Sequence, residues 1–592
     1  MKQFFKFMFA SFAGSLLTLI LVFFVFFVMI AGFIAMADDE KVEIEPNTVL
    51  HIKWTTPIQD RVSDNPFEDF DFATMESNKP VGLNTILKNL DKAIDDPKIA
   101  GIFLDMESIP AGISTIEEIR NKLEEFKETG KFIISYGNSY DQGAYYLATL
   151  SDEIYVHPDG MILFKGLSAQ LFFLKGLLEK LEIEMQIVRG PNNKYKSAVE
   201  PLLLDKMSEA NREQISALIN SIWGKLLLAM SKSRGISVED MNIVADKLDL
   251  TMADRALELT FVDGLFHRDE IIDLLKEKTG VEGDDDLEWI SFGKYTHAKI
   301  DKKEKTSKNK IAVVYAQGSI VQGKNAPNTI GSETTSKALR KARESDKVKA
   351  IVFRVNSGGG DALASEVIRR EVELAAAEKP IIVSMGDVAA SGGYWISTSA
   401  DYIFAQPTTI TGSIGVFGVI PNFKELFNNK LGITFDYVKT NENSEFIDLM
   451  KPMSKFQHEK LDLMITKIYE DFINLVATTR DLDPGFVDGI ARGRVWTGVD
   501  ALELGLVDEM GGLEDAIAYA AVKAEIEDDY RIKEYPLVKP FFEQMVEEIT
   551  GQAKARWIGN EMGEFKTYYD QIQTIRQMKG VQARLPFFYE IN

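Results

Sequence analysis

The stretch PIIVSMGDVAASGGYW, residues 380–395, predicts the fold class of this chain. A short apolar run ends in glycine and aspartate, which is typical of a buried strand that reaches a sharp turn. Small residues follow and surround the hydroxyl of Ser391. At the start of a helix, unpaired N–H groups and the helix dipole stabilise negative charge, as an acyl-transfer nucleophile requires. We therefore expect an α/β domain with a nucleophile at Ser391, although a close-packed strand-to-helix turn would use the same residues.

A second glycine-rich turn lies upstream of this stretch. Residues 355–360, VNSGGG, follow another apolar run at 350–353. Three glycines after a strand let backbone N–H groups approach a ligand closely. Two such turns at neighbouring strand ends can form an oxyanion hole.

The first half of the chain repeats the plan of the second half. Strand-like and helix-like segments alternate in both halves, which is the pattern of parallel βαβ units. The matching pairs are 99–105 with 349–355, 131–137 with 379–386, and 143–146 with 392–395. Aligning Tyr145 with Tyr394 places Gln142 at the position of Ser391, so the first half has no nucleophile.

Several sequence words together resemble one protease family. They are NSGGG at 356–360, ASEVIR at 364–369, SGGYWIS at 391–397, TGSIG at 411–415 and YKSAVEP at 195–201. The chain resembles the signal peptide peptidases (SppA, protease IV) in their long membrane-anchored form, over nearly its whole length except the C-terminal end. Gly358 is a departure, because the family usually has proline there. The resemblance implies two tandem ClpP/crotonase-like domains and a serine–lysine protease.

The resemblance assigns the catalytic pair to different halves of the chain. It makes Ser391 the nucleophile and Lys196 the general base, and the word around Lys196 selects it over Lys194. A lysine becomes a usable base when burial disfavours its ammonium form and lowers its pKa. In the second half, Ile447 aligns with Lys196, so one half retains the lysine and the other the serine. We therefore expect one composite site where the halves meet.

The resemblance also implies supporting groups. The backbone N–H groups of Gly359 and of Gly392 or Gly360 are expected to bind the oxyanion. Ser413 is expected to orient the lysine, although it can equally be a structural turn residue.

Composition restricts the other classes of function. The 592 residues carry a net charge of −23, which argues against a nucleic-acid partner, because phosphate binding needs a basic face. Cysteine is absent, and the five histidines are not spaced as metal pairs. We expect no metal and no cofactor, and a histidine-based triad is disfavoured.

The N-terminus predicts a membrane anchor. No charged residue occurs between Phe7 and Ala37, and at about 1.5 Å per residue a helix of this length exceeds the roughly 30 Å hydrocarbon core. Lysines precede the segment and acidic residues follow it, so the positive-inside rule places the body outside the inner membrane, in the periplasm where there is one. A signal peptide cleaved after Ala37 is the alternative.

These observations divide the chain into five parts. We expect a cytoplasmic tip and anchor at 1–40, a repeat with the lysine at 41–280, a charged linker at 281–310, a repeat with the serine at 311–530, and a helical extension at 531–592. The resemblance implies hydrophobic peptide substrates, chiefly signal-peptide remnants, a homotetramer, and lipid contact through the anchor. Two alternatives remain: a crotonase-like acyl-CoA enzyme and an inactive membrane scaffold.

Overall fold

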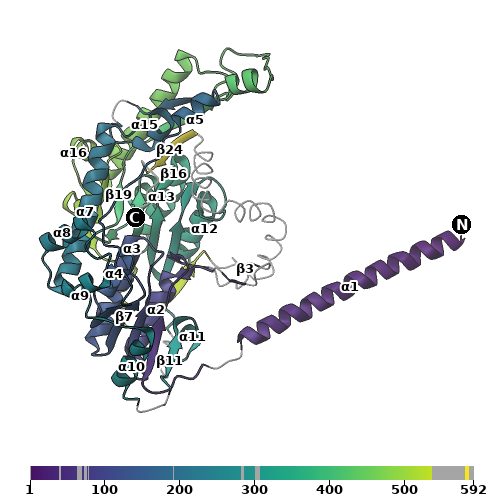
Figure 1. The fold of residues 1–592 in the computed structure, drawn as a ribbon. Helices are drawn as coiled ribbons and strands as arrows, with labels where there is room; N and C mark the ends of the chain where they lie inside the picture. The colour runs from purple at the N-terminus through teal and green to yellow at the C-terminus, as the bar shows by residue number, and fades with distance from the viewer. Residues whose placement is uncertain are drawn as a thin grey trace.

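A computed structural model gives the fold of the chain (Figure 1). Helix α1 (Lys2–Asp38) extends away from the body and is long and apolar enough to cross a membrane, as expected for an anchor or a signal sequence. The structure describes residues 2–38, 42–62, 70–71, 76–77, 79–190, 193–281, 286–300, 307–536 and 580–585.

The first half is built on a six-stranded sheet in the order β10-β8-β7-β6-β1-β11, in which every pairing is parallel. Parallel neighbours need crossover connections, and helices α2 (Leu83–Asp95), α3 (Ile113–Glu128) and α4 (Gln142–Ala148) supply them. The strands are β1 (Thr48–Ile52), β6 (Ile99–Asp105), β7 (Phe132–Gly137), β8 (Glu153–Val156), β10 (Gly264–Leu265) and β11 (Trp289–Ser291).

The second half repeats this arrangement. Its main sheet has the order β21-β19-β17-β15-β12-β23; β18 also pairs with β17, and β22 pairs with β18. Helices α12 (Ser332–Arg343), α13 (Ala362–Ala376) and α14 (Gly392–Ser397) connect its central strands. The strands are β12 (Lys310–Gln317), β15 (Val348–Ser357), β17 (Ile381–Ala390), β18 (Tyr402–Ala405), β19 (Ile410–Gly412), β21 (Val495–Thr497), β22 (Glu509–Met510) and β23 (Arg531–Tyr535).

Matching hydrogen bonds support the internal duplication. The hydroxyl of Tyr145 donates to the carbonyl of Phe261 at 2.8 Å, and that of Tyr394 donates to the carbonyl of Leu506 at 2.8 Å. Each half also has a helix of 26 residues, α7 (Glu209–Arg234) and α15 (Lys455–Arg480). The predicted α/β class with two tandem repeats is confirmed.

A third sheet joins the halves. Its order is β14-β13-β16-β24-β20-β9, and β9 is the strand that the first half contributes. Because β9 pairs with β20, the chain that follows β9 enters the second half. The strands are β9 (Glu184–Val188), β13 (Ser319–Val321), β14 (Thr329–Gly331), β16 (Gly359–Asp361), β20 (Phe417–Asn422) and β24 (Gly580–Arg584).

Two segments differ from the sequence-based division. Part of the expected linker, residues 286–300, forms β11 and α11 (Phe292–His297), because its apolar side chains Ile290, Phe292 and Tyr295 pack in the core of the first half. At the C-terminal end, where a helical extension was expected, residues 531–535 and 580–584 form strands. The helix expected within 537–579 lies outside the described residues.

Shorter elements complete the described chain. They are β2 (Ile58–Gln59), β3 (Phe70–Asp71), β4 (Glu76–Ser77), β5 (Val81–Gly82), α5 (Lys175–Lys180), a 3₁₀ turn (Ser197–Val199), α6 (Glu200–Leu203), α8 (Val238–Lys247), α9 (Ala253–Glu258), α10 (Arg268–Thr279), a π-helical turn (Leu426–Lys430), α16 (Pro484–Ile490), α17 (Gly498–Glu503) and α18 (Leu513–Lys523).

Candidate active site

Ser391 lies at the turn between β17 and α14. Its backbone has φ 57° and ψ −113°, a region that non-glycine residues seldom occupy and that is often found at functional sites. Two bonds hold this conformation: the Ser391 N–H donates to the carbonyl of Gly412, and its own carbonyl accepts from the N–H of Trp395, both at 2.8 Å. The residue is fully buried, and its hydroxyl lies 3.5 Å from the carbonyl oxygen of Gly415.

Lys196 meets this hydroxyl from the other half of the chain. Its Nζ lies 2.7 Å from Ser391 Oγ and 2.9 Å from Ser413 Oγ. The same Nζ donates to the backbone carbonyl of Ser413 at 2.8 Å. The structure therefore brings together three of the predicted site residues, two from the second half and one from the first.

Burial changes the protonation of Lys196. The side chain is fully buried, and desolvation holds the pKa of its amine well below the ordinary value, because an ammonium ion loses its hydration there. A neutral amine has a lone pair that can accept the proton of Ser391 along the 2.7 Å contact.

A glycine loop of the second half fixes the backbone beside Lys196. Gly493 has φ +82°, and a Cβ at this position would lie 2.6 Å from the Cα of Lys196. The carbonyl of the preceding Arg492 accepts from the N–H of Tyr195 at 2.9 Å, and that of Arg494 accepts from the N–H of Ser413 at 2.6 Å. This loop was not among the predicted site residues, because a lone glycine has no local signature in the sequence.

A buried polar network anchors the lysine segment to α7. The amide of Gln214 donates to the carbonyl of Tyr195 at 3.0 Å and to Ser197 Oγ at 2.9 Å. Ser197 Oγ in turn donates to Asn211 Oδ1 at 2.8 Å, and Asn211 donates to a carboxylate oxygen of Glu200 at 3.0 Å. The word YKSAVEP thus supplies, besides the lysine, the groups that fix its backbone.

Lys194 has a different environment. It is exposed, and its Nζ lies 3.1 Å from the hydroxyl of Tyr195. It is therefore a suitable control for Lys196.

The glycines expected to bind an oxyanion lie beside Ser391. Gly359 has φ +93°, and a Cβ there would lie 2.7 Å from the backbone nitrogen of Gly392, so the two backbones are in close contact. The N–H of Gly359 donates to Ser357 Oγ at 3.1 Å, and Gly360 pairs with Ala583 of β24. Gly392 is the first residue of α14, where an N–H has no acceptor in the preceding turn of its helix.

The equivalent place in the first half is filled by an amide. Gln142 stands at the start of α4, and its Oε1 accepts from the backbone N–H groups of Lys165 at 3.2 Å and Gly166 at 3.0 Å. These contacts satisfy a buried polar side chain and provide no nucleophile.

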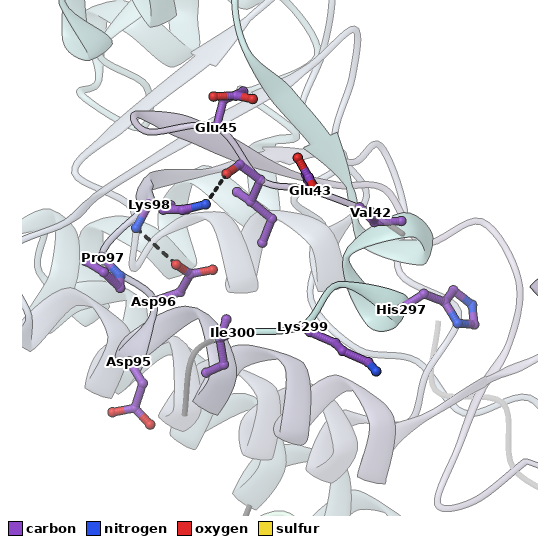
Figure 2. A pocket seen from close by; sticks show the side chains of 11 residues that line it. Val42, Glu43, Glu45, Asp95, Asp96, Pro97, Lys98, His297, Lys299 and Ile300 are labelled. Atoms are coloured by element: carbon purple, nitrogen blue, oxygen red, sulfur yellow. Dashed lines mark hydrogen bonds between the residues drawn. The ribbon is translucent and has the colours of Figure 1, made fainter. Parts of the chain in front are cut away.

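A pocket of about 1070 Å³ lies in the first half and is lined by residues within 42–45, 95–98 and 297–300 (Figure 2). Lys98 is one of the lining residues. Its backbone N–H donates a hydrogen bond to Asp96 Oδ1 at 3.0 Å, and its Nζ donates to the carbonyl of Ile44 at 2.7 Å. The lining contains none of the predicted site residues.

Comparison with known proteins identifies relatives of this chain. Residues 125–282 and 373–527 match the sequence profile of peptidase family S49. The chain is 38% identical to "Protease 4" of Salmonella typhi over 79% of this chain and 76% of that protein. It is 33% identical to the chloroplastic serine protease SPPA of Arabidopsis thaliana over 86% of this chain and 74% of that protein.

Among solved structures, a ClpP1 mutant of Listeria monocytogenes is 18% identical, with 35% of this chain and 94% of that chain covered. Its TM-score is 0.24, which adds nothing to the description of the fold.

Proposed function

Because this chain belongs to peptidase family S49, a family of serine-type peptidases, we propose that it is an endopeptidase with a serine–lysine dyad. Ser391 Oγ attacks the scissile carbonyl while Lys196 takes its proton. Lys196 then protonates the leaving amine, and water hydrolyses the acyl-enzyme with Lys196 again as the base.

The observation that carries this proposal is the contact between Lys196 Nζ and Ser391 Oγ, at 2.7 Å inside a fully buried site. Ser413 supports the amine with its hydroxyl and its carbonyl, so the amine keeps its direction when it loses a proton. The N–H groups of Gly359 and of Gly392 or Gly360 would bind the oxyanion, each worth roughly 3 kcal/mol of transition-state stabilisation.

The substrates we propose are hydrophobic peptides, chiefly signal-peptide remnants. The support is α1, an apolar helix that fits a single membrane anchor and would hold the body at the outer surface of the inner membrane. Peptides released from the same membrane would meet the site there without a soluble carrier.

We further propose that the protein is a homotetramer. The support is the segment 431–438, which exposes large apolar side chains to solvent, as surfaces buried by association commonly do. These are Leu431, Ile433, Phe435 and Val438. Light scattering of the detergent-solubilised protein should then give four times the mass of one chain, whereas the mass of one chain would overturn this assembly.

The proposed chemistry is tested by trapping the acyl-enzyme. Full-length protein in detergent is incubated with a fluorogenic hydrophobic peptide, and tryptic mass spectrometry of the acid-quenched sample locates the acyl group. We expect turnover and an adduct on Ser391, both abolished by Ser391→Ala and both retained by Ser216→Ala, which changes an exposed serine of α7.

The same experiment separates the alternatives. Hydrolysis of an acyl-CoA and not of peptides, unaffected by Ser391→Ala, would indicate a crotonase-like enzyme. Absence of any hydrolysis in the wild-type protein would indicate a scaffold.

A further inference from the structure

Strand β24, near the C-terminal end of the chain, lies inside the third sheet between β16 and β20. Figure 1 shows β24 beside β16. It is antiparallel to both neighbours. Arg584 and Ala583 pair with Gly359 and Gly360 on one side. On the other side, Gln582 pairs with Phe417.

This strand crosses the candidate active site. A Cβ on Gly359 would clash with the carbonyl oxygen of Ala583, and a Cβ on Gly392 would lie 2.9 Å from the same oxygen. The N–H of Leu585 donates to the carbonyl of Gly358 at 2.6 Å. The backbone around Ala583 therefore contacts both the glycine turn and the residue that follows Ser391.

The strand is buried in this position. Ala583 is fully buried, and Gln582, Arg584 and Leu585 are nearly so. Burial also lowers the pKa of Arg584 to about 10, so a charged side chain has lost hydration there. Ser391 and Lys196 are themselves fully buried in this arrangement, so neither side chain is exposed to solvent.

Peptide-binding domains commonly hold an extended segment by adding it as a strand to a sheet edge, where main-chain hydrogen bonds give affinity and pockets for alternate side chains give specificity. With β24 removed, β16 and β20 would each present such an edge, one on either side of a gap one strand wide beside Ser391. The segment that fills this gap belongs to the same chain.

We propose that residues 580–585 are an internal strand that occupies the peptide-binding slot of the serine site and must leave before a substrate can enter. This inference rests on the proposed function, which identifies the slot as the site where a peptide substrate binds. A tethered strand competes at an effective concentration near millimolar. The apparent affinity for peptides is therefore the intrinsic affinity multiplied by the fraction of molecules in which the slot is open.

The test measures binding of a fluorescein-labelled peptide with the sequence of residues 580–585, GVQARL, by anisotropy. All proteins carry Ser391→Ala, so the probe is not cleaved. One is otherwise full length, one ends at residue 579, and one is full length with Ala583→Glu, which places a charge where no space exists. A scrambled peptide of the same composition is the control probe.

We expect both altered proteins to bind GVQARL at least about tenfold more tightly than the full-length protein does, and to bind the scrambled peptide less well. Should truncation unfold the chain, as seen by circular dichroism, the Ala583→Glu protein decides. Equal binding to the full-length and altered proteins, or no binding to an altered protein that is folded, would overturn the inference.

Turnover with Ser391 restored separates this inference from the proposed function. If the altered proteins bind GVQARL but hydrolyse no peptide, the protease proposal is wrong and the internal strand stands. If all three hydrolyse a hydrophobic peptide with equal kcat/KM, the protease stands and the internal strand does not limit access. We expect kcat/KM to rise at least about tenfold when the strand is removed.

Discussion

At the scale of single residues, Lys196 links protonation to folding. In the unfolded chain its amine has an ordinary pKa, and in the folded chain burial lowers that pKa. Between these two values the unfolded state binds more protons than the folded state. The free energy of unfolding therefore falls as the pH is lowered through this interval, by about 1.4 kcal/mol per pH unit.

Replacing Lys196 with methionine should remove this dependence. We expect the melting temperature of Lys196→Met, relative to wild type, to increase steadily as the pH is lowered from about 10 to 7. Thermal melts across this range measure the difference. A Lys194→Met control should show no such trend, and a pH-independent difference for Lys196→Met would show that the amine is not buried in its neutral form.

Gly493 offers a second test at this scale. A side chain there would press on the Cα of Lys196. Gly493→Ala should lower kcat/KM by about 100-fold, because an ångström-scale displacement of a catalytic group has a cost of this order. The matched control is Gly505→Ala, which has a similar φ of +73° but no atom closer than 3.6 Å to the added Cβ.

Both glycine variants should lose about 1 kcal/mol of stability from the positive φ. If Gly505→Ala lost as much activity as Gly493→Ala, the loss would come from general destabilisation.

Some of the candidate site residues could be predicted from the sequence and others could not. Ser391, Lys196 and Ser413 each lie in a recognisable sequence motif. In the structure, Lys196 Nζ is within hydrogen-bonding distance of both serine hydroxyls. Gly493 could not be found in this way, because its role depends on contact with a segment about 300 positions away, and a lone glycine has no local signature.

At the scale of elements, α7 positions the lysine segment through Gln214. This side chain is buried and holds the backbone carbonyl of Tyr195 and the hydroxyl of Ser197. Gln214→Leu keeps a side chain of similar volume and removes the hydrogen bonds to Tyr195 and Ser197. We expect a loss of about 1–3 kcal/mol in unfolding free energy from the groups left unpaired.

The same change should lower kcat about tenfold with little change in KM, since it disturbs the base and not the substrate contacts. Asn220→Leu, at an exposed position on the same helix, should leave both parameters unchanged. Steady-state kinetics and denaturant titration measure these effects, and unaltered kcat in Gln214→Leu would show that the network does not position Lys196.

The elements that the sequence predicted were those with strong local patterns. The central strands and the apolar α1 have such patterns. The pairing of β9 with β20 and the insertion of β24 join segments far apart in the chain. Local periodicity could not predict them, because it indicates the type of an element and not its distant pairing partner. The sequence predicts a linker where β11 forms, because only a few apolar residues occur there within a charged run.

At the scale of the whole molecule, a buried ionic cluster joins the halves. Arg354 of β15 lies between Asp60 at 2.8 Å and Glu118 at 2.6 Å, both from the first half, and all three side chains are buried. Removing the cation leaves two carboxylates without compensation in the interior.

Arg354→Met should therefore destabilise the protein by about 3–5 kcal/mol. Chemical denaturation is the measurement. Arg370→Met is the control, because its ion pair with Glu373 is solvent-exposed and worth less than about 1 kcal/mol. A loss no larger than that of the control would mean that this cluster does not stabilise the contact between the halves.

The proposed catalysis depends on one active site made from both halves. The most direct test is kcat/KM for a fluorogenic hydrophobic peptide, measured on the full-length protein and on Lys196→Ala, Ser391→Ala and Lys194→Ala. We predict that kcat/KM falls at least about 10³-fold in Lys196→Ala and Ser391→Ala while both stay folded and equally associated, and that Lys194→Ala stays near wild type. Activity in Lys196→Ala comparable to that of Lys194→Ala would contradict it.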